Sequence, residues 1–274
     1  MYSSRCLFTR TRFFRSYVLF VSGIRYIIVI LEKTRLNKER KMNPTKKTAI
    51  IVGVLFIVAT VAGVISGIFW GSVMDAPDYL SNVAANKPQM IISGLFLLIM
   101  GLAAAGIGIM MYPILKKQNE ALAIGYAGFR ISEGVLMSVS VVSLISLVTL
   151  SQEFVKAGAP DASYFLTLGN LLQEGQFWAY HMGTISFGLA APMFYYSLYK
   201  SKLVPRWLSV WGLIGVPLWL TVSLLIMFGS IAESLEMFFY LPIGVNEMVL
   251  AVWLIIKGFS PSVAASGFAK TDTN

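Results

Sequence analysis

Residues 48–71 read TAIIVGVLFIVATVAGVISGIFWG, a stretch without a single charged side chain. A helix rises about 1.5 Å per residue, so a stretch of this length can cross the roughly 30 Å hydrocarbon core of a bilayer. Backbone polar groups in lipid must find their partners within the segment, and an α-helix satisfies them. The stretch therefore predicts a transmembrane helix.

Five further stretches of similar character follow it along the chain. They cover residues 89–112, 123–150, 175–199, 207–230 and 238–257, and they are interrupted chiefly by Gly, Ser and Thr. Only 13% of the whole chain is charged, against about 25% in an ordinary soluble domain. The sequence predicts an all-α fold, a polytopic membrane bundle of six transmembrane helices within residues 42–259, with the lipid bilayer as its partner.

The basic residues between these stretches alternate in number. One set of flanks and loops holds nine Lys and Arg, and the other set holds two, Lys87 and Lys156. Because Lys and Arg are retained on the cytoplasmic side, this alternation predicts that both termini are cytoplasmic and that the protein is a multi-pass protein of the cell membrane. The nine residues are Lys46, Lys47, Lys116, Lys117, Lys200, Lys202, Arg206, Lys257 and Lys270.

Residues 1–41 form a basic extension with ten Lys and Arg and two acids. Since the net charge of +9 is concentrated there, we expect no nucleic-acid partner for the body of the protein. Two interpretations of the extension remain open: an upstream sequence in front of a true start at Met42, or an interfacial anchor formed by residues 17–31. Residues 260–274 are predicted to be a short disordered cytoplasmic tail.

The sequence contains few of the residues and motifs that bind cofactors or metal ions. A single Cys and a single His, Cys6 and His181, exclude sites that need several thiolates or imidazoles. No nucleotide-binding, zinc-protease or GxSxG hydrolase motif occurs. We therefore expect no cofactor and no metal. We favour a non-enzymatic protein, and the sequence identifies no catalytic residue.

A few polar residues fall inside or at the edge of the predicted spans, where an ionisable group costs about 2.5–3.5 kcal/mol on insertion scales. Arg130 and Glu133 share a helical face, and Glu247 lies near the middle of its span. Such groups need a partner or a polar cavity. The candidate buried polar cluster consists of Arg130, Glu133, Glu247, Asn246, His181, Glu174 and Tyr126.

Two functional hypotheses use this cluster. In the first, the protein is a small transporter, permeation unit, sensor or accessory subunit that handles a small molecule or an ion. In the second, it is an intramembrane enzyme acting on a lipid or prenyl substrate, with Glu133 or Glu247 as general base and His181 as proton carrier. In a structural alternative, Arg130 and Glu133 form an ion pair that only neutralises the two charges and has no further function. The oligomeric state and the substrate stay open.

Three glycines on the first span, Gly63, Gly67 and Gly71, recur at four-residue spacing. This spacing places small residues on one helical face and predicts a close contact with another helix, within the chain or between two chains.

Three stretches carry a resemblance to a family. They are GYAGFRISEG at 125–134, YYSLYKSKLVPRWLSVWGLIG at 195–215 and LPIGVNEMVLAVWLIIKGF at 241–259. Together they resemble the bacterial membrane proteins grouped as domain of unknown function 4386, over about residues 42–259. The resemblance implies a six-helix protein of the plasma membrane and implies no activity. The extension has no counterpart in it.

Overall fold

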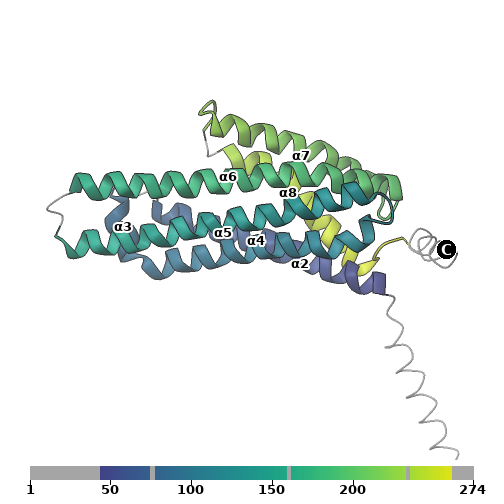
Figure 1. Ribbon diagram of the computed structural model, residues 1–274, viewed down its shortest axis with the longest axis horizontal. Helices are drawn as coiled ribbons and strands as arrows, with labels where there is room; N and C mark the ends of the chain where they lie inside the picture. Colours follow the sequence, from purple (N-terminus) through teal and green to yellow (C-terminus); the bar gives the residue numbers. More distant parts are fainter. Residues whose placement is uncertain (1–43, 75–77, 159–161, 233–234, 261–274) are drawn as a thin grey trace, which may run out of the picture. The chain divides into compact units, whose positions relative to one another are not determined.

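The computed structural model describes residues 44–74, 78–158, 162–232 and 235–260. The predicted extension (residues 1–41) and residues 261–274 of the predicted tail lie outside these ranges. The described residues form seven helices and no strand (Figure 1), so the predicted all-α class is confirmed. They are α2 (Pro44–Met74), α3 (Tyr79–Ala85), α4 (Lys87–Leu115), α5 (Glu120–Lys156), α6 (Ala162–Ser201), α7 (Arg206–Met227) and α8 (Glu236–Ile256). The described residues from Thr45 onward belong to one compact unit, to which the following description refers.

Five of these helices are long and apolar enough to cross a membrane by length and composition. They include Thr45–Met74, Lys87–Leu115, Glu120–Lys156, Arg206–Met227 and Phe238–Ile256. Helix α6 is also long enough, but it is less apolar because its first half contains Asn170, Gln173, Glu174, Gln176 and His181. The prediction of a multi-pass membrane protein is confirmed at this level, and the number of six crossings stays a prediction.

Consecutive long helices run antiparallel along the unit (Figure 1). Helices α5 and α6 have 37 and 40 residues, whereas α7 and α8 have 22 and 21. At 1.5 Å per residue the first two are about 55 and 60 Å long, well beyond the roughly 30 Å bilayer core. They therefore extend past the predicted spans 123–150 and 175–199, chiefly at the end away from the α6–α7 turn.

The ends of the helices follow ordinary local rules. Asn119 caps α5 by accepting a hydrogen bond from the Leu122 amide at 3.0 Å, and Pro205 precedes the first turn of α7. Gly229 and Gly258, with φ of 66° and 74°, follow α7 and α8. Because this left-handed conformation strains residues with a side chain, these two glycines allow the chain to leave each helix.

The short helix α3 was not predicted from the sequence. It is capped by Asp78 and packs against α4 and α5. Its Tyr79 hydroxyl donates a hydrogen bond of 2.9 Å to Asn170 Oδ1 of α6. Seven residues are too few for an apolar period to stand out, which explains why α3 was missed.

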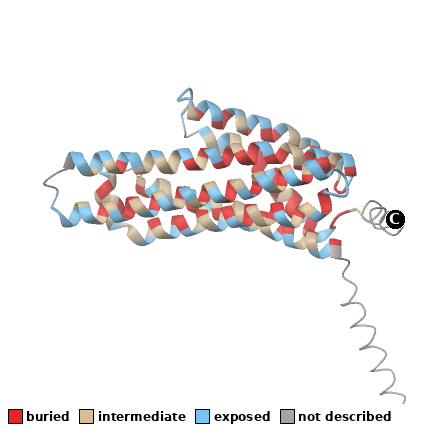
Figure 2. Ribbon diagram, in the orientation of Figure 1, coloured by how far each residue is buried: buried red, intermediate tan, exposed pale blue. Residues whose placement is uncertain are grey.

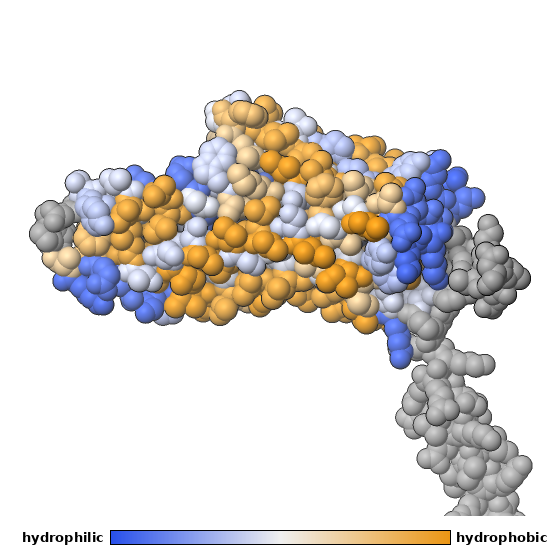
Figure 3. All heavy atoms as spheres, in the orientation of Figure 1, coloured by the Kyte–Doolittle hydropathy of each residue, from blue (hydrophilic) through white to orange (hydrophobic). Residues whose placement is uncertain are grey.

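Apolar side chains cover the outside of the bundle as well as its interior. Buried residues line the facing sides of the helices (Figure 2), while Leu102, Val142 and Ile214 are more than 60% exposed. In the face shown in Figure 3, apolar atoms occupy the middle of the unit and hydrophilic atoms gather toward its ends. A continuous apolar surface of this extent is incompatible with water and fits contact with lipid.

Glycines allow the backbones of α4 and α5 to approach each other closely. A Cβ added to Gly134 would lie 2.6 Å from the Gly101 carbonyl oxygen. At Gly67 of α2, by contrast, such an atom would have no neighbour within 4 Å, and at Gly63 it would meet only the flexible Met100 side chain. Within the described unit, the predicted close contact of this face occurs at Gly63, where α4 supplies Met100, and not at Gly67. Closer approaches to a backbone occur at Gly134 of α5 and at Gly53 of α2, where an added Cβ would lie 2.7 Å from the Ala251 carbonyl oxygen of α8.

Candidate functional site

The centre of the site is a buried ion pair on α5. Arg130 and Glu133 are 3% and 7% exposed, and Arg130 Nη1 lies 3.0 Å from Glu133 Oε2. The pair meets the distance for an ion pair but not the alignment of a hydrogen bond, since Oε2 has no hydrogen-bond partner among the described residues. The attraction is therefore Coulombic, and the Glu133 carboxylate keeps an oxygen available to another donor.

Helix α4 holds the guanidinium from the other side. Arg130 Nε donates a hydrogen bond of 3.2 Å to the Ala104 carbonyl oxygen. This contact is possible because α4 has Gly108 opposite Arg130; a Cβ at Gly108 would lie 2.7 Å from Arg130 Cβ. The small-residue face of α4 thus lets α5 come close enough to place a charged side chain between the helices.

A second carboxylate comes from α8. Glu247 is 7% exposed and interacts electrostatically with Arg130 and Glu133, but it forms no ion pair within 4.0 Å among the described residues. One arginine therefore faces two buried acids from two helices. With both acids ionised, the group would carry an uncompensated negative charge, which is costly in an apolar interior.

Aromatic side chains surround these charges and connect further helices to them. The Arg130 guanidinium carbon lies 5.3 Å from the Phe187 ring centre of α6, a cation–π contact. Phe187 packs edge-on against Trp219 of α7 at 5.2 Å, and Trp219 packs against Tyr240 of α8 at 5.3 Å. Tyr240 in turn interacts with the Thr60 side chain of α2. All six long helices thus contribute to one layer.

Two tyrosines complete the layer. Tyr126, a predicted member of the cluster, is 2% exposed and stacks on Phe194 with ring centres 5.0 Å apart. Tyr195 of α6, which the sequence analysis did not include, is 1% exposed, and both tyrosines interact electrostatically with Arg130 and Glu247. Tyrosine is common both in apolar cores and at membrane interfaces, so no sequence pattern distinguished Tyr195.

His181 lies apart from the acids. Its Nδ1 is 3.1 Å from Ser223 Oγ of α7, and its ring packs against Phe177 at 4.3 Å. No carboxylate of the described residues forms a hydrogen bond or an ion pair with it. The imidazole has the hydroxyl partner that a buried histidine needs, and it is not joined to the acids as a general acid–base pair.

The last two predicted members differ from each other. Asn246 is fully buried, and its Nδ2 donates a hydrogen bond of 3.0 Å to the Leu208 carbonyl oxygen of α7. Glu174 is exposed on α6 and takes no part in the interior. The structure thus brings together Arg130, Glu133, Glu247 and Tyr126. Asn246 precedes Glu247 in the chain and bonds to α7, and His181 and Glu174 lie elsewhere. No group of three His, Cys, Asp or Glu side chains in the described part of the chain could hold a metal ion.

Residues 51–258 match the family described as "Domain of unknown function (DUF4386)". The chain belongs to this family. The matched DUF4386 region contains every residue of the site described above and does not include residues 1–41. The family resemblance found in the sequence is therefore confirmed. This DUF4386 protein matches no curated protein and no solved structure.

Proposed function

We propose that the protein is a proton-coupled transporter of the bacterial plasma membrane and that Glu247 binds the proton. The observation that supports this is the composition of the buried layer: one guanidinium faces two carboxylates, all less than 10% exposed. One more positive charge balances the group, and a proton needs only a single carboxylate oxygen. Ionisable residues inside a membrane bundle are typical of ion and substrate pathways.

Glu247 suits this role better than Glu133. Glu133 has Arg130 at 3.0 Å, whereas Glu247 has no cation within ion-pair distance among the residues that the structure describes. The charged and titratable groups around Glu247 are Arg130 and Glu133 of α5, Tyr126 of α5, Tyr195 of α6 and Tyr240 of α8. Arg130 interacts more weakly with Glu247 than with Glu133, so a proton binds more readily to the Glu247 carboxylate.

The enzyme hypothesis finds less support in this geometry. It requires His181 within hydrogen-bond reach of a carboxylate, and His181 is bonded to Ser223 instead. Untargeted metabolite and lipid profiling of a strain lacking the gene separates the two hypotheses. A transporter predicts altered amounts of a small polar solute, whereas lipid or prenyl chemistry predicts a missing lipid species.

Infrared spectroscopy of the purified protein in lipid tests proton binding directly. At neutral pH we expect a carbonyl band of a protonated carboxylic acid, and Glu247→Gln should abolish it. Glu174→Gln is the matched control, because Glu174 is exposed on α6 and should leave the band intact. A spectrum without such a band at any pH from about 5 to about 8 would rule out Glu247 as the proton site.

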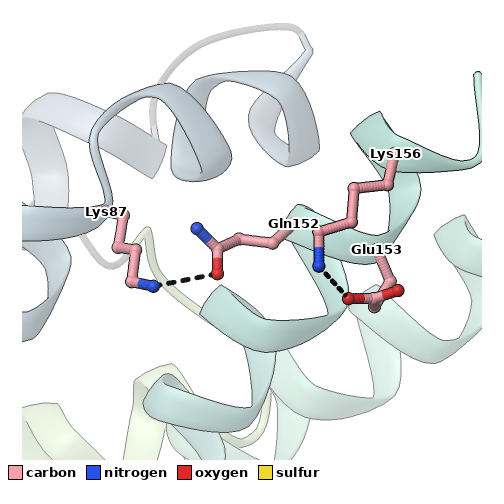
Figure 4. A network of polar contacts seen from close by, with 4 residues as sticks. All are labelled: Lys87, Gln152, Glu153 and Lys156. Carbon is pink, nitrogen blue, oxygen red and sulfur yellow. Dashed lines mark hydrogen bonds and ion pairs between the residues drawn. The ribbon is translucent and has the colours of Figure 1, made fainter.

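We further propose that six helices cross the membrane, with both termini in the cytoplasm. The starts of α2, α5 and α7 and the ends of α4, α6 and α8 lie at one end of the unit (Figure 1), with exposed lysines such as Lys46, Lys116 and Lys257. The two basic residues of the other end have side-chain partners (Figure 4). Lys87 Nζ lies 3.0 Å from Gln152 Oε1, and Lys156 Nζ lies 2.7 Å from Glu153 Oε1. This asymmetry agrees with the positive-inside rule.

Reporter fusions along the chain check this topology. Fusions after Lys117, Arg206 and Lys257 should report the cytoplasm, and fusions at Asp78, Asp161 and Glu233 should report the outside. The fusions that flank α6 matter most, because α6 is the least apolar of the six long helices. A reversed signal at any two sites would refute the six-span arrangement.

A further inference from the structure

Three fully buried side chains next to the charged layer each have a polar atom without a hydrogen-bond partner among the described residues. They are the hydroxyl of Tyr195 on α6, Oγ of Ser209 on α7 and Oδ1 of Asn246 on α8, with exposed fractions of 1%, 0% and 0%. A buried polar atom left unpaired costs about 1–3 kcal/mol. Three of them from three helices therefore point to a polar ligand small enough to fit between packed side chains.

Packing contacts place the three side chains around the start of α7. The Tyr195 ring lies so close to Gly212 that a Cβ there would be 2.4 Å from ring carbons. Asn246 donates to the carbonyl oxygen of Leu208, one turn before Gly212 on the same helix. Ser209 follows Leu208 directly and shares a face with Gly212. Tyr195 of α6 and Asn246 of α8 thus contact the same part of α7 that contains Ser209.

This group connects the end of the bundle to Glu247. Ser209 is in the first turn of α7, which begins at Arg206, one of the exposed basic residues of that end. Tyr195 interacts electrostatically with Glu247, and Asn246 is its neighbour in the chain. These relations connect the first turns of α7, through Tyr195 and Asn246, with the part of the bundle that contains the Glu247 carboxylate.

We propose that Tyr195, Ser209 and Asn246 form a water-binding site through which protons reach Glu247 from the lysine-bearing end of the bundle. The inference rests on the proposed function. A hydronium ion at the site donates its proton to the Glu247 carboxylate, which leaves a carboxylic acid and a neutral water molecule. The water accepts from the Tyr195 and Ser209 hydroxyls or donates to Asn246 Oδ1, so it satisfies the polar atoms in both states.

Hydrogen–deuterium exchange of the Glu247 carboxylic acid tests this access. When the buffer is changed to heavy water, the carbonyl band of Glu247 shifts as its proton is replaced, and the shift gives an exchange rate. In a Tyr195→Phe, Ser209→Ala double variant the rate should fall about tenfold, the equivalent of about 1.4 kcal/mol or one net hydrogen bond. Both changes remove a single oxygen and keep the side-chain shape.

Ser151→Ala is the matched control, because Ser151 is equally buried and equally unpartnered but lies near the far end of α5. Slower exchange in the double variant with an unchanged rate in Ser151→Ala would support the access route, and each single variant should then give an intermediate rate. An unchanged rate in the double variant would overturn the route while the band itself upholds proton binding at Glu247. A wild-type protein without the band would overturn both proposals.

Discussion

Replacing Arg130 with Leu should destabilise the protein more than replacing Arg130, Glu133 and Glu247 together. The single change leaves two buried carboxylates without their cation and removes the hydrogen bond to the Ala104 carbonyl oxygen. Removal of one partner from a buried ion pair costs about 3–5 kcal/mol, whereas exchange of the whole group for neutral residues is often close to neutral. The melting temperature and the yield of the purified protein in detergent measure the difference.

The triple variant Arg130→Leu, Glu133→Gln, Glu247→Gln should recover most of the lost melting temperature. Arg206→Leu provides the control, since it makes the same chemical change at an exposed arginine that lies over the Tyr199 ring, and it should shift stability by less than about 1 kcal/mol. Strict additivity of the Arg130 change with both glutamate changes would mean that the three residues do not share a site, since contacting groups couple by about 0.5–3 kcal/mol.

Gly134→Ala should lower the melting temperature even though alanine is the better helix former. The added methyl group would lie 2.6 Å from the Gly101 carbonyl oxygen, and a backbone atom cannot move aside as a flexible side chain can. Helices α4 and α5 must then separate, which also disturbs the contact of Arg130 with Ala104. Overpacking of this kind costs about 1–3 kcal/mol.

Gly128→Ala on the same helix is the control for this change. Its Cβ would have no neighbour within 4 Å, and the residue is exposed. Its melting temperature should be equal to that of the wild type or slightly higher, because the helix gains about 1 kcal/mol of propensity. Equal effects of Gly134→Ala and Gly128→Ala would show that α4 and α5 do not approach as closely as described.

The charged part of the site could be predicted because ionisable residues are rare inside apolar transmembrane segments. Arg130, Glu133 and Glu247 are conspicuous in spans where an ionisable group is costly, and that cost alone predicts that they face the interior. His181 and Glu174 share this local signal but not the location. Their distance from the acids depends on how α6 is rotated toward α7, which no feature of the α6 sequence specifies.

The uncharged part of the site could not be found in the same way. Tyr195, Ser209 and Trp219 are ordinary residues of membrane helices, and their importance comes from the atoms opposite them, such as Gly212 for Tyr195. Gly63, Gly67 and Gly71 of α2 have the clearer spacing, yet closer approaches to a backbone occur outside it, at Gly134 of α5 and at Gly53 of α2. A glycine permits a close contact between helices, but its spacing in the sequence does not show whether a second helix packs against it.

The sequence by itself determined that the protein is an all-helical membrane protein and that it belongs to its family. These properties depend on hydropathy and on backbone hydrogen bonding within one segment, which neighbouring residues settle locally. Only the tertiary structure decided which side chains meet, from the Arg130–Glu133 pair to the three polar groups around the start of α7. Lipid is as apolar as the residues that face it, so hydrophobicity gives little information on the rotation of a helix, and packing and polar contacts between helices set that rotation instead.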